Sequence, residues 1–316
     1  MERPSIAIIP SAYKTGVLAA VLPNNGIADL DFTRGSIATR VNAQGLIEEV
    51  GVNVPRLDYS SGGCPSLLLE PQSINLITYS EDFSNESWVK LASIISSNSI
   101  ISPKGELTAD TIIDDTANTT HRFYQLISLS ASTDYAVSVF AKKGTNNFIQ
   151  LSLRNSSDSS TASYVFDLEN GVLGEIIESG NGNIVGGKIE DYGNGWYRCT
   201  IIGNITTAPN QYSVMLADSA SGNTFGVNGM VTYLGTGTNT VYLWGAQLEQ
   251  QSSDTSYIPT QITQITRLED APSLDLTPFN ITSIIETIDG VEQPPITTIP
   301  TIYNAPIGRV NKILMY

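Results

Sequence analysis

Short runs of strand-forming residues, separated by polar turns, recur along the middle of the chain and restrict its fold more than any other feature. Turn sequences such as Lys-Gly-Thr-Asn-Asn at 143–147 divide these runs, and no helical repeats lie between them. The runs are Phe123–Leu129, Tyr135–Ala141, Phe148–Leu153, Ser163–Leu168, Gly195–Ile202, Tyr212–Ala217 and Thr240–Leu248. Many short strands without intervening helices favour an antiparallel sandwich over a parallel sheet.

The composition indicates the same fold class. Charged residues make up 15% of the chain, and Lys and Arg together number only 16, so strong helix formers are scarce. Ile, Val, Tyr and Thr, which favour strands, recur throughout. Alternation within Tyr135–Ala141 places Tyr135, Val137 and Val139 on one face of a strand. The chain is therefore predicted to be all-β, with an antiparallel β-sandwich over residues 76–268.

The N-terminal part differs from this regular middle. Ser36–Val50 holds two strand-like runs around a Gly-containing turn, which predicts a hairpin. Prolines and glycines between Pro55 and Pro71 then interrupt regular structure, as is typical of an extended segment. Residues 1–75 are therefore expected to form an extended arm that carries a hairpin.

The C-terminal part changes character again. The Asp289-Gly290 pair is a hairpin turn signal, and Arg309–Tyr316 is a strand candidate. A piece this small cannot build a core alone. Residues 269–316 are therefore predicted to form a small β or extended segment that packs on the sandwich, on a neighbouring subunit or on another protein.

Charge and residue counts exclude several classes of protein. The net charge of −15 argues against binding to nucleic acid or to an anionic membrane, because basic patches supply most of that affinity. No apolar run approaches the roughly 20 residues needed to span a bilayer, so membrane insertion is not expected. Cys64 and Cys199 are too few for a disulfide framework and are predicted to be buried free thiols. The single histidine, His121, is assigned to a strand edge or the surface.

Several sequence runs resemble virion fibre and spike proteins of tailed bacteriophages. They are Ala38–Glu48, Asn53–Tyr59 and Gly63–Gln72, which resemble the linker before the fibre module, and Asn75-Leu76, Tyr79–Phe83, Trp88, Gly193–Cys199, Trp244–Glu249 and Ser256–Thr260, which resemble a jelly-roll domain of the carbohydrate-binding-module type. The similarity spans residues 30 to 270. It does not extend to the tail beyond Asp270.

The resemblance implies a structural virion protein, a head fibre or tail appendage on the capsid or tail surface that is made in the host cytoplasm. It also implies a jelly-roll sandwich, a homotrimer and contacts of the N-terminal arm with capsid or tail subunits. Host-surface glycans are the candidate ligands. Two alternatives stay open: a purely architectural particle protein without a ligand and, with less support, a polysaccharide-degrading tail spike.

Candidate site residues follow from this interpretation. Trp88, Tyr192 and Tyr233 are the candidates for stacking on sugars, because an aromatic face packs well on the apolar face of a pyranose. Trp196 and Trp244 lie inside strand-like runs and are predicted to be core residues instead. The candidates for virion attachment and assembly are Arg40, Arg56 and Tyr59.

No catalytic residue is predicted, and the chain is not expected to be an enzyme. Glycoside hydrolysis needs two carboxylates on either side of one bond. Adjacent pairs such as Asp114-Asp115 and Glu190-Asp191 point to opposite faces when they lie in a strand. No cofactor is expected. A structural calcium ion stays open because oxygen-rich loops suit it, but the sequence identifies no metal ligand.

Overall fold

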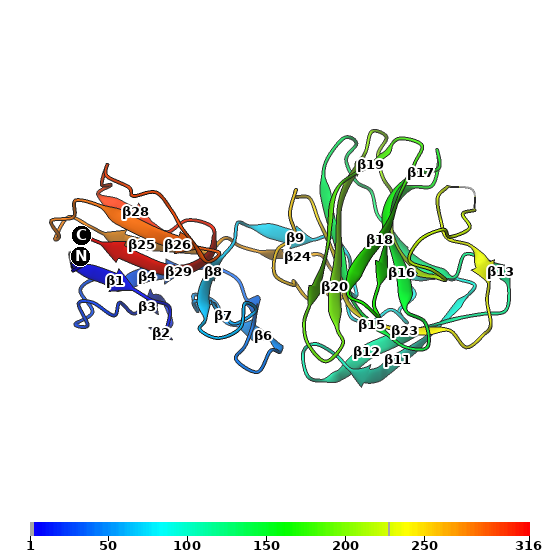
Figure 1. Cartoon of the computed structure of the whole chain (residues 1–316), viewed down its shortest axis with the longest axis horizontal. Helices are drawn as coiled ribbons and strands as arrows, with labels where there is room; N and C mark the ends of the chain where they lie inside the picture. The colour runs from blue at the N-terminus through cyan, green and yellow to red at the C-terminus, as the bar shows by residue number, and fades with distance from the viewer. Residues whose placement is uncertain (1–2, 227) are drawn as a thin grey trace. The chain divides into compact units, whose positions relative to one another are not determined.

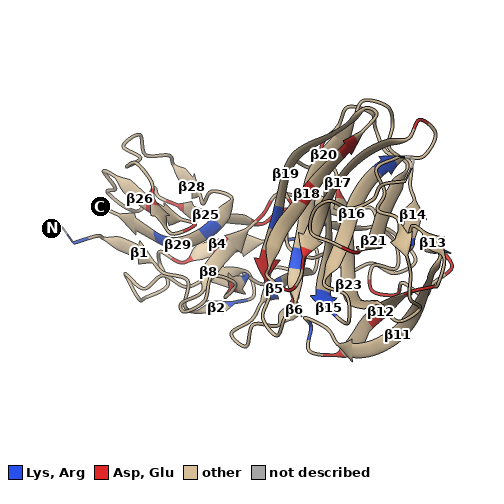
Figure 2. Ribbon diagram, turned by 45° about the vertical axis from the view of Figure 1, so that its right-hand side comes forward, with Lys and Arg blue, Asp and Glu red and all other residues tan. Residues whose placement is uncertain are grey.

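The computed structural model describes residues 3–226 and 228–316, and every regular element in these residues is a β-strand (Figure 1). The prediction of an all-β chain is confirmed. The described part of the chain contains no helix that is long and apolar enough to cross a membrane. Charged residues appear as scattered coloured segments along a largely uncharged ribbon (Figure 2).

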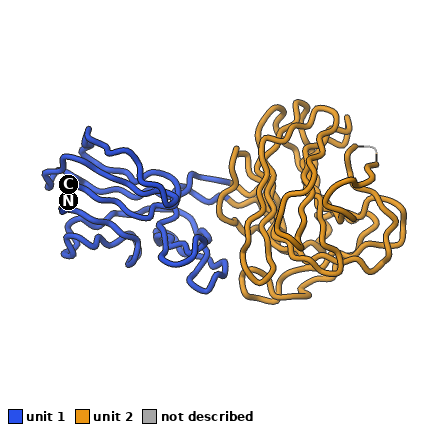
Figure 3. The backbone as a smooth tube through the Cα atoms, in the orientation of Figure 1, with its two compact units in different colours: residues 1–73, 266–316 blue, residues 74–265 orange. Residues whose placement is uncertain are grey.

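The chain divides into two compact units (Figure 3). Unit 1 comprises Met1–Ser73 and Thr266–Tyr316, and unit 2 comprises Ile74–Ile265. The chain leaves unit 1 through β9 (Ser73–Asn75) and returns through β24 (Ile265–Arg267), and these two short strands pair with each other. Unit 2 has nearly the bounds that the sequence predicts for the sandwich.

Two six-stranded antiparallel sheets form unit 2. In spatial order, one contains β10 (Val89–Leu91), β14 (Arg122–Leu126), β21 (Gln211–Ala217), β16 (Phe148–Asn155), β17 (Ser160–Asp167) and β18 (Val172–Ser179). The other contains β11 (Ser93–Ile101), β12 (Leu107–Asp114), β23 (Thr240–Glu249), β15 (Tyr135–Lys143), β20 (Tyr197–Ile205) and β19 (Gly182–Asp191). A two-stranded sheet joins β13 (Asn118–Thr119) to β22 (Tyr233–Leu234). Each strand predicted between residues 123 and 248 is present.

Residues from both sheets form one hydrophobic core in unit 2. In β15 the inward side chains are Tyr135, Val137 and Val139, as the alternation predicts. From the other sheet, Leu151 and Leu153 of β16 enter the same core. Burying an aliphatic or aromatic side chain of this size contributes roughly 1.5–3 kcal/mol. Because two sheets share this core, the predicted antiparallel sandwich is confirmed.

The two edge strands β18 and β19 belong to opposite sheets and are joined by a short turn at Gly180-Asn181. Gly180 has a φ of 59°, and a Cβ there would lie 2.6 Å from the hydroxyl oxygen of Ser160. A larger residue would therefore strain the turn. Glycine at this position allows the chain to pass from one sheet of the sandwich to the other.

Unit 1 also contains two larger sheets. The first contains β27 (Val291–Glu292), β26 (Ile284–Ile288), β29 (Gly308–Met315), β8 (Ser66–Leu69) and β7 (Leu57–Asp58), with β1 (Ile6–Ile8) also paired to β29. The second contains β2 (Tyr13–Lys14), β3 (Val17–Leu18), β4 (Leu30–Thr33), β25 (Ala271–Asp275) and β28 (Ile302–Asn304). The hairpin predicted in Ser36–Val50 is present as β5 (Ala38–Val41) and β6 (Ile47–Val50).

The structure divides the two chain ends differently from the prediction. The N-terminal segment is not an extended arm, and the C-terminal segment is not a separate piece, because both sheets of unit 1 contain strands from both segments. The last strand, β29, pairs with both β1 and β8, and β4 pairs with β25. A common core includes Phe32 from the first segment and Ile313 from the second. Each segment thus provides strands that pair with those of the other segment and core residues that pack against them.

The two cysteines lie in different environments. Cys199 is a core residue of unit 2, and burial raises the pKa of its thiol well above the ordinary value. Cys64 is exposed, so the prediction that it is buried is wrong. It follows Gly62 and Gly63, which both have positive φ values and belong to an exposed turn.

Candidate functional site

Trp88 is a core residue. Its side chain is 1% exposed and packs edge to face against Phe83 and Phe123, with ring centroids 5.2 Å away in both cases. Its indole Nε1 donates a hydrogen bond to the carbonyl oxygen of Tyr79 at 3.0 Å. The prediction that Trp88 stacks on a sugar is therefore wrong, because both faces of the ring are buried among other side chains.

The other two aromatic candidates lie apart from that core position. Tyr233 is 9% exposed and packs on His121 with a centroid distance of 4.5 Å, so it offers no open ring face either. His121 itself is buried, contrary to its predicted surface or edge position, and its Nδ1 lies 2.7 Å from the carbonyl oxygen of Ala92. Tyr192 is partly exposed and meets Phe140 edge to face at 4.9 Å. Of the three candidates, only Tyr192 has part of its side chain accessible.

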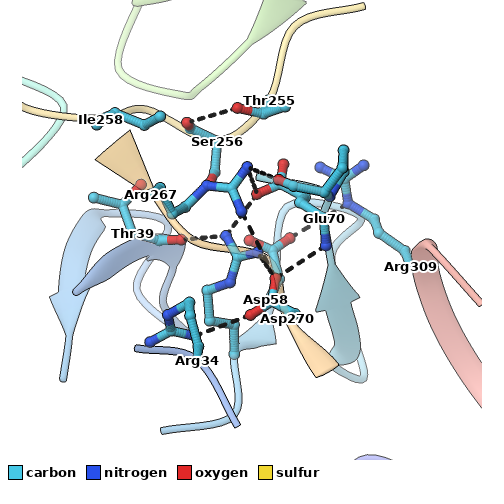
Figure 4. A network of polar contacts seen from close by, with 12 residues as sticks. Arg34, Thr39, Asp58, Glu70, Thr255, Ser256, Ile258, Arg267, Asp270 and Arg309 are labelled. Carbon is cyan, nitrogen blue, oxygen red and sulfur yellow. Dashed lines mark hydrogen bonds and ion pairs between the residues drawn. The ribbon is translucent and has the colours of Figure 1, made fainter. Parts of the chain in front are cut away.

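Arg56 is an internal residue of unit 1. Its guanidinium forms ion pairs with Glu70, at 2.7 Å, and with Asp270. Asp270 also pairs with Arg34 at 3.0 Å, and Glu70 lies 3.5 Å from Arg267 (Figure 4). We call these five residues the unit 1 ion cluster. Because Arg56 is fully buried within it, the prediction that Arg56 contacts other virion proteins is wrong.

Arg40 and Tyr59 lie nearer the surface of unit 1. The side chain of Arg40 is 13% exposed, and its Nε donates to Glu48 across the β5–β6 hairpin at 2.7 Å. Tyr59 is partly buried and packs against the unit 1 core. Their assignment to virion attachment stays a prediction.

A polar surface that sequence reasoning missed lies on the outer side of three neighbouring strands of unit 2. In β16 the core residues Leu151 and Leu153 alternate with Ser152 and Arg154, which therefore point away from the core. The same alternation in β14 and β21 turns further polar side chains to this side. We call this surface the arginine face, and it comprises Arg122 and Tyr124 of β14, Gln211 and Ser213 of β21, and Ser152 and Arg154 of β16.

The two arginines of this face converge on one side chain. Arg122 on β14 and Arg154 on β16 both donate from Nη1 to Oε1 of Gln211, at 3.3 and 2.9 Å. Gln211 belongs to β21, the strand between the other two. The guanidinium of Arg122 also lies 4.4 Å from the ring centroid of Tyr124. Two positive charges are therefore held side by side above a single strand.

No acidic side chain in the described residues pairs with either arginine of this face, although Arg122 is 7% exposed and Arg154 is 4% exposed. Burial and, to a smaller extent, the neighbouring charge of Arg154 lower the pKa of Arg122 to about 10. Burial also lowers the pKa of Arg154. A buried charge without an opposite charge is costly, so these two side chains are held at an energetic disadvantage.

Other hydrogen-bonding groups on this face also lack partners. Ser152 and Ser213 lie opposite each other in the register, and both hydroxyl groups are buried without a hydrogen bond in the described residues. The Nε groups of Arg122 and Arg154 are in the same state. Native proteins satisfy most buried polar groups, so several orphaned groups within one face are unusual.

Exposed apolar side chains border the arginine face. Leu126 follows Tyr124 on the same side of β14 and is 61% exposed. On the neighbouring edge strand β10, Val89 and Leu91 stand opposite Tyr124 and Arg122 in the register, and both are exposed. The face therefore combines a charged, hydrogen-bonding centre with an apolar margin.

The described residues contain no group of three or more His, Cys, Asp or Glu side chains placed to hold a metal ion. The polar groups that converge on the arginine face are instead mainly donors, because a guanidinium has no acceptor. This arrangement suits an anion.

The sequence matches no family model and no curated protein. Among the solved structures that resemble it over part of their length are the following two. The enzymatically active domain of bacteriophage CBA120 tailspike protein 4 aligns with 55% of this chain and 21% of its own, at 10% identity and a TM-score of 0.32. The CBM22-1–GH10 modules of Clostridium thermocellum endo-1,4-beta-D-xylanase 10B, complexed with xylohexaose, align with 60% of this chain and 30% of theirs, at 13% identity and a TM-score of 0.33. The chain thus spans less than a third of either protein.

Proposed function

We propose that this chain is a non-enzymatic structural protein of a tailed-bacteriophage particle, a head-fibre or tail appendage that binds host-surface glycans through the arginine face of unit 2. The virion assignment is supported by the resemblance of residues 30 to 270 to phage fibre and spike proteins. The glycan assignment is supported by the arginine face. In this proposal the arginine face takes the role that the sequence assigned to Trp88.

One observation carries the binding role: buried donors and hydroxyls on the outer side of a sheet have no partner within the described chain. Sugars present many hydroxyl groups that can accept and donate hydrogen bonds, together with an apolar ring face. A site with hydrogen-bonding groups at its centre and exposed Leu126 at its margin matches both properties.

Unit 1 is assigned to attachment and assembly. It carries Arg40 and Tyr59, and it contains both ends of the described chain. We propose that unit 1 contacts capsid or tail subunits and that the chain assembles as a homotrimer. Light scattering on the purified protein would then give three times the chain mass of 34.0 kDa. A monomeric mass would contradict the trimer.

The architectural alternative is favoured by one specific observation. Trp88, Trp196 and Trp244 are all at most 2% exposed, so none of the tryptophans in this chain offers a stacking platform. An architectural protein would be present on the particle and bind no glycan. The two candidate functions therefore differ in a property that can be measured directly.

The test combines location with binding. Antibodies against the full chain should label purified particles at the head or the tail, and the purified chain should bind a subset of a broad glycan panel. Labelled particles together with binding to no glycan would establish the architectural alternative. Release of new reducing ends from a bound polysaccharide would contradict the non-enzymatic assignment.

A further inference from the structure

We infer that the arginine face is a binding site for an anionic sugar, whose carboxylate is held between Arg122 and Arg154. This inference rests on the proposed glycan-binding function and specifies its ligand. It starts from two buried arginines that share a neutral partner, Gln211, and have no carboxylate of their own in the described chain.

Other buried arginines of this protein show what such a side chain ordinarily requires. Arg198, in the same unit and 3% exposed, lies 3.3 Å from the carboxylate of Asp254 and donates to the carbonyl oxygen of Thr255 at 2.8 Å. Burial opposes its charge, but Asp254 and other acidic neighbours outweigh burial and raise its pKa. The arginine face lacks this compensation, and a bound anion would supply it.

The geometry favours a carboxylate over a larger group. Arg122 and Arg154 approach from strands on either side of β21, and their Nη1 groups meet at Oε1 of Gln211. A guanidinium presents a planar fork of donors that matches a carboxylate through two parallel hydrogen bonds. Since only 7% of Arg122 and 4% of Arg154 are exposed, a small group can reach them more easily than a broad surface can.

The margin of the site suits the rest of a sugar acid. Val89, Leu91 and Leu126 are 39%, 43% and 61% exposed and lie on the same side of the sheet as Arg122. The apolar face of a pyranose ring can pack on such side chains. A uronic or sialic acid therefore has one group for the arginines and one surface for the apolar margin.

The overall charge of the chain restricts the kind of anion that can bind. With a net charge of −15, the protein repels polyanions at long range. Partly buried charges are screened less by salt than exposed ones, so the two arginines still act at short range. Recognition by this site therefore depends on short-range contacts with the two arginines. Extended polyanions such as DNA are not expected to bind.

Calorimetric titration of the full chain with two matched oligosaccharides tests the inference. The probes are α-1,4-linked trigalacturonate and α-1,4-linked galactotriose, which differ in the carboxylates, and a panel of sialylated and sulfated glycans accompanies them. We expect binding to carboxylated sugars, at least 10-fold weaker binding of the neutral counterparts, and weaker binding of sulfated ones.

Three variants localise the effect. Arg122→Gln and Arg154→Gln should each weaken binding of the carboxylated sugar about 10- to 100-fold, since each removes hydrogen bonds to a charged group. Lys104→Gln is the matched control, because it removes one positive charge of unit 2 from the turn between β11 and β12. It should leave affinity unchanged, and circular dichroism should show that all three variants are folded.

The outcomes separate this inference from the proposed function. Equal binding of neutral and carboxylated sugars, or acid-selective binding that survives both arginine substitutions, would overturn the anionic site and leave glycan binding intact. Binding to no glycan of the panel would overturn both. Preference for sulfated over carboxylated sugars would replace the carboxylate with a sulfate and overturn the inference as stated.

Discussion

Buried arginines occur in both units of this protein, but they are compensated in different ways. In the unit 1 ion cluster, Arg56 pairs with two carboxylates, and these outweigh burial and raise its pKa. Arg34, which pairs with Asp270 alone among the acidic side chains of the described residues, is the exception within that cluster, and burial lowers its pKa. In the arginine face of unit 2, Arg122 and Arg154 have no acidic partner in the described residues.

This difference separates a structural role from a binding role. Breaking a buried pair leaves an uncompensated charge and is strongly destabilising, so the unit 1 ion cluster should hold its two chain segments together. An arginine that is already uncompensated contributes little to stability, and in the proposed function a bound anion offsets the cost of burying it. Buried charge alone therefore does not indicate a candidate binding site, whereas buried charge without an opposite charge does.

The largest expected effect is that of Asp270→Asn. Asp270 accepts hydrogen bonds from Arg34 at 3.0 Å, from Arg56, and from the backbone N–H of Glu70 at 2.9 Å. Without this charge, Glu70 is the one carboxylate left in the unit 1 ion cluster to balance its three arginines. We expect unit 1 to lose about 3–5 kcal/mol of unfolding free energy.

The distribution of tryptophan makes this change measurable for one unit at a time. All three tryptophans lie in unit 2, so their fluorescence follows that unit, whereas far-ultraviolet circular dichroism follows both. In Asp270→Asn, a urea transition seen by circular dichroism should move to lower concentration without a shift in fluorescence. Glu292→Gln, which removes an exposed carboxylate 4.0 Å from Lys312, should move neither. An unshifted dichroism transition in Asp270→Asn would refute the structural role of the cluster.

Sequence reasoning predicted the middle of the fold because its strands are amphipathic. Tyr135–Ala141 alternates apolar residues toward the core, and the structure places these residues there. The edge strands β11 and β19 were missed, because one or both of their faces are exposed and their sequences, such as Ser93–Ile101, mix Ser and Asn with Ile. Pairing of β1 with β29 joins residues at opposite ends of the chain, and no local pattern encodes such a pairing.

The candidate site was less predictable than the fold. Trp88 is a plausible sugar-stacking residue by type, because aromatic rings pack on sugars. The same apolar surface also favours burial, and Trp88 lies in the core. Arg122 and Arg154 did carry a signal, since each alternates with core residues within a strand, at Arg122-Phe123 and Leu153-Arg154. Their convergence across β21 depends on strand order, which the sequence does not show.

An effect of intermediate size is expected from a buried carboxylate of unit 2, which, like the arginines of the arginine face, has a pKa shifted by burial. Asp110 is 1% exposed and accepts backbone hydrogen bonds from Phe83 and Asn98, both at 2.9 Å. Burial raises the pKa of Asp110 to about 6, in spite of these hydrogen bonds. Because the folded state then holds this proton more tightly than the unfolded state, with its pKa of about 3.9, stability falls as pH rises between those two values.

We expect unit 2 to lose about 1–3 kcal/mol from this group between pH 4.5 and 7. Carboxylates with lowered pKa values, such as Asp254 and Glu175, titrate below that window. The measurement is urea unfolding followed by tryptophan fluorescence at several pH values. Asp110→Asn removes the titrating group, so its stability should be nearly constant across the window. A slope that persists in this variant would assign the pH dependence to other groups.

The smallest expected effect is the most informative for the arginine face. Arg154→Gln removes a buried charge that repels Arg122, and the new amide can still donate to Gln211. We therefore expect the unfolding free energy of unit 2 to stay within about 1 kcal/mol of the original value or to rise. Arg198→Gln is the matched comparison within the same unit, because it removes a buried ion pair and the hydrogen bond to the carbonyl oxygen of Thr255, and it leaves Asp254 with Lys188 as its basic partner. It should cost about 3 kcal/mol. Both are read from tryptophan fluorescence in urea.

If Arg154→Gln is as costly as Arg198→Gln, then Arg154 stabilises the sandwich by contacts of its own, and an unfilled anion site no longer explains its burial.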